Sequence, residues 1–393
     1  MTVSRPGSSA DDLGFFFAPW HAEVAHRAAD LAALWTPSAK DERAATIDAV
    51  RRLAAAGLLA YCVPQTFGGA DVGRPEELDT RALTLIREAL GWADGLLDTA
   101  FAMQGLGSYP ITLAGTDAQK SRYLPGVLAG KRLGAFALTE PSAGSDVASM
   151  ACHARRDGAD YVIDVEKTFI SNAGCAGQYV LFATVDPSVG RKGITAFIVE
   201  PDDVGLTVDP IEVIAPHPIG RLIFEGCRIP ASRRLGEEGT GFKLAMRTLD
   251  VFRTTVGGAA LGMARRALDE GLARATTRRQ FGKPIIDQQQ IAAYLADSAT
   301  DLDAARLMVF RAAHARDTSS ARVSSEVAMG KLFATEAAQR IIDRAVQIHG
   351  GLGVTRGVPV ERLYREIRAL RIYEGTSEIQ RVVISAGLKK RQG

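Results

Sequence analysis

The sequence predicts a multidomain α+β protein with three parts: an N-terminal helical domain at residues 1–130, a small β-barrel or β-sandwich domain at 131–235, and a C-terminal four-helix bundle at 236–393. Three observations predict this class. The 393 residues exceed what one hydrophobic core supports, so the chain should divide into two or three domains. Apolar residues recur at helical spacing toward both ends of the chain. Short β-branched and aromatic runs, separated by turn residues, occupy the middle.

The N-terminal domain is predicted from amphipathic patterns. Residues 44–59 place apolar side chains at spacings of three to five, which is typical of a helix with one buried face. Those side chains are Ile47, Val50, Leu53 and Leu58. Proline and glycine at residues 63–69 then predict a loop. Two further helices are predicted at residues 76–92 and 100–113.

The middle domain is predicted from four short segments that are rich in β-branched and aromatic residues. They are residues 161–170, 178–185, 194–200 and 222–225. Glycine, proline, aspartate and serine separate these segments, as they do in a compact β structure with tight turns.

After Pro230 the helical pattern returns and continues to the end of the chain. Four long segments are rich in alanine, leucine, methionine and arginine, which are good helix formers. They are residues 241–274, 288–316, 324–350 and 377–389. The connections between them are short, so we expect the four helices to pack as a bundle.

The charge pattern argues against two classes of partner. The net charge of +2 arises from 47 basic and 45 acidic side chains spread along the chain. No basic block stands out, so nucleic acid and membrane surfaces are not expected partners. No uninterrupted apolar run of about 18 residues predicts a membrane span, and residues 1–12 lack the pattern of a signal peptide. We therefore expect a cytoplasmic protein.

Cysteine and histidine show no metal-binding pattern. The four cysteines form no CxxC pair, and none of the six histidines lies four residues from another histidine or from a cysteine. Disulfide frameworks and zinc sites need closer or more regular spacing. No metal site is therefore expected.

Two segments at predicted strand ends offer polar groups to a ligand. Residues 136–146 read FALTEPSAGSD, in which proline and glycine predict a turn with exposed N–H groups and hydroxyls. Residues 167–174 read KTFISNAG and place the ring of Phe169 two residues before the hydroxyl of Ser171. A ring can pack on a planar cofactor and a hydroxyl can hydrogen-bond to it. Taken alone, residues 136–146 are also consistent with an ordinary turn, and Phe169 with a core aromatic residue.

Three further segments suit phosphate groups or proton transfer. Residues 278–284 read RRQFGKP, and a guanidinium matches a pyrophosphate because it is permanently charged and planar. Residues 347–353 read QIHGGLG, where two glycines allow close approach of a ligand or end a helix. Residues 373–380 read YEGTSEIQ, in which Thr376 or Ser377 also suits the N-cap of the last helix.

In this order and on these element types, the segments resemble those of the acyl-CoA dehydrogenases, from about residue 57 to residue 384. The resemblance implies an FAD-dependent enzyme that converts an acyl-CoA thioester to the trans-2-enoyl-CoA. The glutamate of the YEGT motif is the catalytic carboxylate of the family, so Glu374 would remove the α-proton while the flavin takes the β-hydrogen as hydride. A homotetramer, with an electron-transferring flavoprotein as electron acceptor, is also implied.

The resemblance assigns binding residues in three groups. Contacts to FAD are implied for Phe136, Leu138, Thr139, Ser145, Phe169, Ser171, Thr376 and Glu378. Contacts to the FAD of a neighbouring subunit are implied for Arg278, Gln280, Phe281, Gln289, Gln347, Gly350 and Gly351. Substrate contacts are implied for Ser145, Asp250, Arg253 and Gly375. Two positions depart from the family pattern, because Phe169 stands where tryptophan is common and Ser171 where threonine is frequent.

The acyl group and its carrier are less defined. Residues 95–108 contain Asp98 but no arginine, so the cationic anchor of dicarboxyl-acyl relatives is absent from this segment. A short, branched or cyclic acyl group is therefore expected. The alternatives are an acyl-carrier-protein substrate, an acyl-CoA oxidase that uses oxygen, and a non-catalytic nucleic-acid-binding relative. Some family branches carry the base on the first bundle helix, where Asp250 is the candidate.

Overall fold

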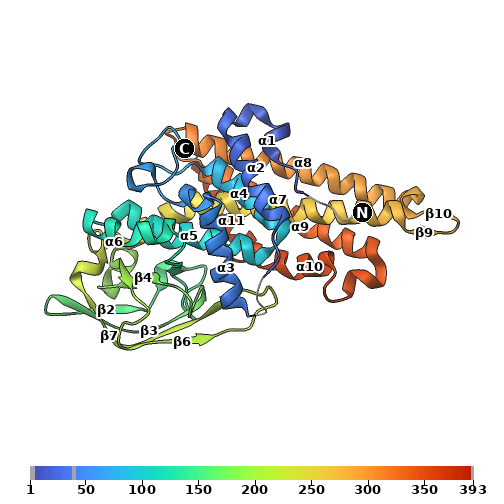
Figure 1. Cartoon of the computed structure of the whole chain (residues 1–393). Helices are drawn as coiled ribbons and strands as arrows, with labels where there is room; N and C mark the ends of the chain where they lie inside the picture. The colour runs from blue at the N-terminus through green and yellow to red at the C-terminus, as the bar shows by residue number, and fades with distance from the viewer. Residues whose placement is uncertain (1–4, 38–40, 391–393) are drawn as a thin grey trace. The chain divides into compact units, whose positions relative to one another are not determined.

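The computed structural model describes residues 5–37 and 41–390, with helices toward both ends of the chain and a β-sheet in the middle (Figure 1). This confirms the predicted α+β class. The chain forms two compact units, each assembled from separate stretches. The helical unit comprises Met1–Thr36, Asp79–Asp98 and Val251–Gly393, and the mixed unit comprises Pro37–Leu78 and Thr99–Asp250. The division into three domains at residues 130 and 235 stays a prediction.

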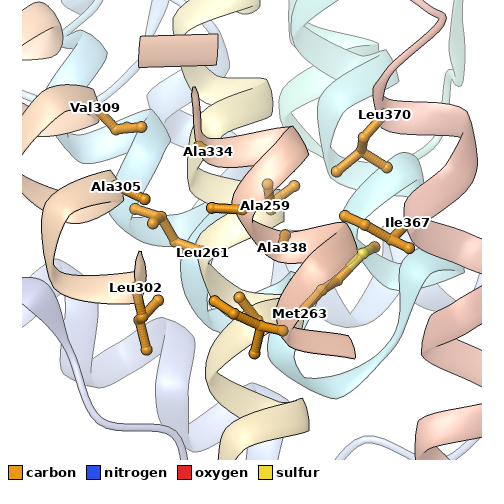
Figure 2. Packing of buried hydrophobic residues seen from close by; sticks show 14 of the residues in the cluster. Ala259, Leu261, Met263, Leu302, Ala305, Val309, Ala334, Ala338, Ile367 and Leu370 are labelled. Carbon is orange, nitrogen blue, oxygen red and sulfur yellow. The ribbon is translucent and has the colours of Figure 1, made fainter. Parts of the chain in front are cut away.

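The helical unit contains the long C-terminal helices. Its helices are α1 (Ser9–Asp12), α2 (Pro19–Ala33), α4 (Thr80–Ala93), most of α7 (Gly241–Thr277), α8 (Gln289–Thr318), α9 (Ser324–His349), α10 (Pro359–Leu370) and α11 (Ser377–Lys390). Their core joins many alanines to a few large side chains from α7, α8, α9 and α10, among them Leu261, Leu302 and Ile367 (Figure 2). Such small residues let helix backbones approach closely.

Two glycines on α7 allow the backbone of α4 to approach the backbone of α7 closely. A Cβ atom at Gly262 would lie 2.0 Å from the backbone oxygen of Glu88, and one at Gly258 would lie 2.4 Å from that of Thr84. No side chain larger than hydrogen fits at either position without moving the α4 backbone. The close packing of α4 on α7 places polar residues of the two helices within hydrogen-bond reach of each other.

The mixed unit is built around one sheet. Its helices are α3 (Glu42–Ala55), most of α5 (Gly95–Ala114) and α6 (Asp117–Leu128). Its strands are β1 (Gly134–Ala137), β2 (His153–Asp157), β3 (Asp160–Ser171), β4 (Gln178–Thr184), β5 (Ile194–Val199), β6 (Leu206–Pro210), β7 (Ile219–Pro230) and β8 (Arg234–Leu235). The strand order is β6-β7-β3-β2-β4-β5-β8, with β1 parallel to β4. The pairing of β3 with β7 is irregular between Lys167 and Ile170.

The predicted segments correspond closely to helices and strands of the structure, but α2, α6, β2 and β6 were not predicted as separate elements. Helix α10 was not predicted, although its signals are in the sequence: Pro359 occupies the first helical position, and buried apolar residues follow at helical spacing. Those residues are Val360, Leu363, Ile367 and Leu370. Among the residues that the structure describes, no helix has both the length and the apolar character that a membrane span requires.

Candidate active site

Glu374 lies in the connection between α10 and α11, at residues 371–376. Its φ of 53° is in the left-handed region, which costs a residue with a Cβ atom about 1–2 kcal/mol. Such a conformation persists only where the surroundings impose it. The contacts of this connection therefore determine where the carboxylate points.

Three consecutive backbone carbonyls of the connection accept hydrogen bonds from basic side chains. Lys331 of α9 donates from Nζ to the carbonyl of Tyr373 at 2.6 Å and to that of Gly375 at 2.5 Å. Arg253 of α7 donates from Nε to the carbonyl of Glu374 at 2.9 Å. These three bonds fix the peptide planes on both sides of Glu374.

The carboxylate of Glu374 has the properties of a general base. Its Oε2 atom is buried and has no hydrogen-bond partner among the described residues. Burial raises the pKa of Glu374, because the carboxylate loses hydration, while the charges of Arg87, Lys331 and Arg253 oppose the rise. An oxygen that no donor occupies, on a carboxyl group with a raised pKa, can accept a proton from a bound substrate.

Arg87 of α4 and Asp98 of α5 form a buried ion pair near Glu374. Arg87 donates from Nε and Nη2 to the two carboxylate oxygens at 2.8 and 2.7 Å, and from Nη1 to Thr255 at 3.0 Å. Burial opposes the charge of Arg87, but Asp98 raises its pKa overall. Arg87 also hydrogen-bonds to the side chain of Tyr373. The guanidinium of Arg87, which belongs to α4, thus lies beside Asp98 of the segment 95–108. Its charge is already neutralised by Asp98.

In the mixed unit, a second buried ion pair shapes the turn after β1. Lys167 donates to Glu140 at 2.7 Å and to the carbonyl of Leu138 at 3.2 Å. The carboxylate of Glu140 also accepts the N–H groups of Ala151 and Cys152, at 2.6 and 3.0 Å. The charges of Glu140 and Lys167 are thus satisfied by contacts within the unit. The turn leaves Ser145 exposed to solvent.

The end of β3 presents an aromatic ring and a hydroxyl. Phe169 has a φ of 55° and a side chain that is 60% exposed, although it lies in a strand. The irregular pairing of β3 at this point turns the ring outward. Ser171 lies 3.2 Å from the Nε2 atom of His217, and the other ring nitrogen lies 2.9 Å from the carbonyl of Ala215. Sequence analysis did not single out His217.

The remaining residues of the predicted flavin site in this unit are less exposed. Phe136 packs on Phe182, with ring centroids 4.9 Å apart. Leu138 is buried, and the carbonyl of Thr139 accepts the N–H of Thr168 at 2.9 Å. Phe136, Leu138 and Thr139 thus support the turn that carries Ser145.

The N-terminus of α11 begins with a capping residue and adjoins a small pocket. Thr376 accepts the N–H of Ile379 at 3.3 Å and so caps the helix, as its local sequence suggested. Thr376 and Glu378 also line a small pocket with two arginines, Arg368 and Arg371. Guanidinium groups beside a helix N-terminus are suited to a phosphate or a ribose.

The residues predicted to serve a neighbouring subunit lie at another place in the helical unit. Gln280 and Phe281 belong to a hairpin of β9 (Arg279–Gln280) and β10 (Lys283–Pro284), where Phe281 is 92% exposed with a φ of 52°. Gln347 lies 16 residues beyond Lys331 on α9, which is roughly 24 Å at the helical rise per residue. Arg278, Gln289, Gly350 and Gly351 are likewise exposed. The structure does not bring this group to Glu374 of the same chain.

The predicted substrate residues divide between the two units. Arg253 and Gly375 contact or adjoin Glu374 in the helical unit, whereas Ser145 and Asp250 belong to the mixed unit. In the part of the chain that the structure describes, no group of three His, Cys, Asp or Glu side chains is arranged to hold a metal ion.

The residues present fit FAD, the cofactor that the resemblance implies. The mixed unit offers the exposed ring of Phe169 for a planar ring system and the hydroxyl of Ser171 for its polar edge. In the helical unit, a Cβ atom at Gly350 or Gly351 would meet nothing within 4 Å, so backbone is open to a ligand there. The exposed guanidinium of Arg278 provides a cation for a pyrophosphate.

Three polar residues near Glu374 were missed by sequence analysis: Lys331, Arg87 and Thr255. The position of Lys331 could have been detected in the sequence. Lys331 falls on the face of α9 that carries Val327, Ala328, Ala334 and Ala338, so helical periodicity places a charge on an apolar stripe. Arg87 had no such signal, because twelve of the other thirteen residues of α4 are also buried and no face is distinguished.

Comparison with known proteins gives a consistent assignment. Sequence models of the acyl-CoA dehydrogenase N-terminal, middle and C-terminal domains match residues 20–131, 135–227 and 239–389. A 3-(aryl)acrylate reductase of Clostridium sporogenes is 39% identical over 346 residues, 87% of this chain and 90% of that protein. An acryloyl-CoA reductase (NADH) of Anaerotignum propionicum is 41% identical over 346 residues, 87% of this chain and 86% of that protein.

Among solved structures, butyryl-CoA dehydrogenase from Megasphaera elsdenii is similar with a TM-score of 0.87 and 32% identity, over 95% of this chain and 98% of the other. The similarity thus extends over nearly the whole of both chains. All three parts of the chain match the corresponding domain models in the same order. The chain belongs to the acyl-CoA dehydrogenase family and is an FAD-dependent oxidoreductase.

Proposed function

We propose that this protein catalyses α,β-dehydrogenation of an acyl-CoA thioester to the trans-2-enoyl-CoA, with Glu374 as the base. One observation carries the proposal: Oε2 of Glu374 is buried and has no hydrogen-bond partner among the described residues, while the backbone on both sides is held by Lys331 and Arg253. A carboxylate that is held in place, desolvated and free to accept a proton is what general-base catalysis requires.

Glu374 accepts the α-proton at a carboxylate oxygen. The C–H bond breaks, its electron pair forms the α,β double bond, and the β-hydrogen leaves with its own electron pair. FAD, when bound, supplies the acceptor for that hydride. The backbone N–H of Glu374 donates to the thioester carbonyl, by analogy with the family, and stabilises the charge that develops on its oxygen. Burial keeps water from the carboxylate and raises its pKa toward that of the substrate.

FAD would be held by residues from more than one chain. By the resemblance, Phe169, Ser171 and Ser145 of the mixed unit and Thr376 of the helical unit would each contribute contacts from one subunit. The hairpin with Arg278 and Phe281 and the glycines Gly350 and Gly351 would reach the FAD of a neighbour. Two features support this arrangement: Gln347 lies roughly 24 Å along α9 from Lys331, and Phe281 is exposed in a strained conformation. We therefore propose a homotetramer.

The Arg87–Asp98 pair bears on the acyl group. An arginine that anchors a substrate carboxylate needs an unpaired charge, but the charge of Arg87 is paired with Asp98 through Nε and Nη2, and Nη1 also donates to Thr255. A second carboxylate in the substrate would also be repelled by Asp98. These contacts favour an acyl group without a terminal carboxylate, so we propose a short, branched or cyclic acyl-CoA.

The reverse reaction is a second candidate, because two relatives that are 39% and 41% identical are named reductases of acrylate-type compounds. The same base and cofactor would then deliver a proton to the α-carbon and a hydride to the β-carbon. A subunit of a caffeyl-CoA reductase–Etf complex, 38% identical, supports an electron-transferring flavoprotein as redox partner. A solved prolyl acyl carrier protein oxidase, 30% identical, keeps a carrier-protein substrate and oxygen as alternatives. The cytoplasm stays a prediction.

Anaerobic titration with a panel of acyl-CoAs tests the proposal. The purified protein should be yellow, and a saturated acyl-CoA of suitable shape should bleach the flavin absorbance near completion without any other reductant. Oxygen uptake during aerobic turnover would identify an oxidase. A flavin that no saturated CoA or carrier-protein thioester can bleach, in a fully FAD-loaded protein, would rule out dehydrogenation.

Arg278→Ala is expected to weaken FAD binding by about 1.5–3 kcal/mol, the range for a hydrogen bond to a charged group. The loss should be accompanied by weaker subunit association, since this arginine would contact the FAD of another chain. Equilibrium dialysis and analytical ultracentrifugation measure the two effects. Arg340→Ala, which removes an exposed arginine paired with Asp301 on the same unit, is the control and should change neither. Tight FAD binding by a stable monomer would contradict the shared site.

A further inference from the structure

Lys331 is the least expected residue of the helical unit. It lies in α9 and is 1% exposed, on a helix face that otherwise carries valine, alanine and threonine. Removing an ammonium group from water costs several kcal/mol unless hydrogen bonds and opposite charge replace the lost hydration. Something in the surroundings of Lys331 must offset that cost in free energy.

The replacement comes from the backbone around Glu374. The ammonium donates to the carbonyls of Tyr373 and Gly375, at 2.6 and 2.5 Å, and these residues stand immediately before and after Glu374. The carbonyl between them accepts Nε of Arg253 at 2.9 Å. Two bonds from one atom to positions i and i+2 bend the chain around the ammonium. This bend is compatible with the positive φ of Glu374 and that of Gly375, which is 93°.

The charges around Lys331 come from two other elements. Glu374, in the connection before α11, favours the ammonium form, whereas Arg253 of α7 disfavours it. Burial has the largest effect, and together these influences lower the pKa of Lys331 to about 7. In return, the charge of Lys331 opposes the rise in the pKa of Glu374. The lysine and the glutamate are therefore linked both by backbone geometry and by electrostatic attraction.

We propose that Lys331 is a positioning residue for the reaction: it holds residues 373–375 in the conformation that directs the Glu374 carboxylate, and its charge keeps that carboxylate ionised. The proposal rests on the proposed function of Glu374 as the base. A residue that only joined α9 to the connection would require neither a charge nor bonds on both sides of Glu374. An apolar side chain of the same length would pack as well.

Lys331→Met tests the proposal, because methionine has a similar length but neither charge nor donors. In the FAD-loaded enzyme, the rate constant of flavin reduction should fall about 10²-fold, as expected when a catalytic group is displaced by about 1 Å. The acyl-CoA concentration for half-saturation should change less than about threefold, because the ammonium of Lys331 hydrogen-bonds to the backbone carbonyls of Tyr373 and Gly375. With the cation gone, the pKa of Glu374 rises, so the acidic limb of the pH–rate profile should move to higher pH.

Three comparisons make the test specific. Lys331→Arg keeps a cation and should leave the acidic limb near its wild-type position even if the rate falls. Arg340→Met removes a cation from the exposed side of the same helix. It should change neither the rate constant of flavin reduction nor the acidic limb of the pH–rate profile. Hydrogen exchange of the peptide spanning residues 373–376 should accelerate in Lys331→Met and not in Arg340→Met. This last measurement does not depend on turnover.

The outcomes separate the inference from the proposed function. A slower reaction with an unmoved acidic limb would overturn the inference, because Lys331 would then be only a packing residue. The inference would also be overturned if Lys331→Met reduced its flavin at the wild-type rate and showed wild-type hydrogen exchange at residues 373–376. If no thioester bleaches the wild-type flavin, the proposed function fails, but accelerated exchange at residues 373–376 would still show that Lys331 holds this segment.

Discussion

Glu374→Gln is expected to abolish reduction of the flavin by an acyl-CoA while leaving the protein folded. Loss of a general base typically costs about 10²–10⁴-fold in rate, and the buried position of Oε2 leaves little room for a substitute water. The amide has the shape of the carboxylate and keeps the same backbone bonds from Lys331 and Arg253. FAD content should therefore match the wild type. Stopped-flow absorbance with a good substrate measures the effect.

Glu374→Asp is the matched variant, because it keeps the charge and shortens the reach by one methylene group. It should retain part of the activity. If Glu374→Gln reduces its flavin within about tenfold of the wild type, less than a missing base normally costs, the base lies elsewhere. Asp250, on the first bundle helix, would then be the next residue to replace.

Asp98→Ala is expected to lower the free energy of unfolding by about 3–5 kcal/mol, the usual result of removing one partner of a buried ion pair. The guanidinium of Arg87 is 2% exposed and would lose the acceptors of two of its hydrogen bonds. The variant should also show a lower pKa of Glu374, since Asp98 contributes to raising it. Denaturant unfolding of the FAD-loaded protein and the pH–rate profile measure the two effects.

The comparison variants isolate the cause. The double variant Arg87→Met, Asp98→Leu removes both charges and should recover most of the lost stability, because no buried charge is left without a partner. Arg27→Ala breaks the exposed pair of Arg27 with Glu23, and such a pair contributes about 0.3–0.5 kcal/mol. A loss below about 1 kcal/mol in Asp98→Ala would mean that water or another group compensates Arg87.

Local patterns were sufficient to predict most of the fold. Residues 324–350 were predicted as a helix from apolar spacing, and α9 spans Ser324–His349. The segment 222–225 gave only the centre of β7, because the ends of this long strand, at Ile219–Pro230, include glycine, cysteine and arginine. Strand pairing depends on residues far apart in sequence. The eight-stranded order with a parallel β1 therefore could not be read from any single segment.

For the candidate site, the sequence motif predicts the catalytic residue, whereas the residues that surround it are identified from tertiary contacts. The YEGT segment located Glu374 because the motif is local. Arg87 could not be found by the same reasoning, since it precedes Glu374 by 287 positions in the chain and its role appears only when α4 packs on α7. The sequence shows Asp98 and no arginine in residues 95–108, but the partner of Asp98 can be identified only in three dimensions.

The left-handed backbone conformation of Glu374 has a consequence for the evolution of this protein. Four described residues other than glycine have positive φ, and three of them are Phe169, Phe281 and Glu374. Each lies at a position proposed to serve flavin or substrate, and each would be more stable as glycine or in a relaxed loop. Selection for stability alone would remove these side chains. The chain thus gives up part of its folding free energy at these three positions, and substitutions that stabilise it without loss of activity should leave them unaltered.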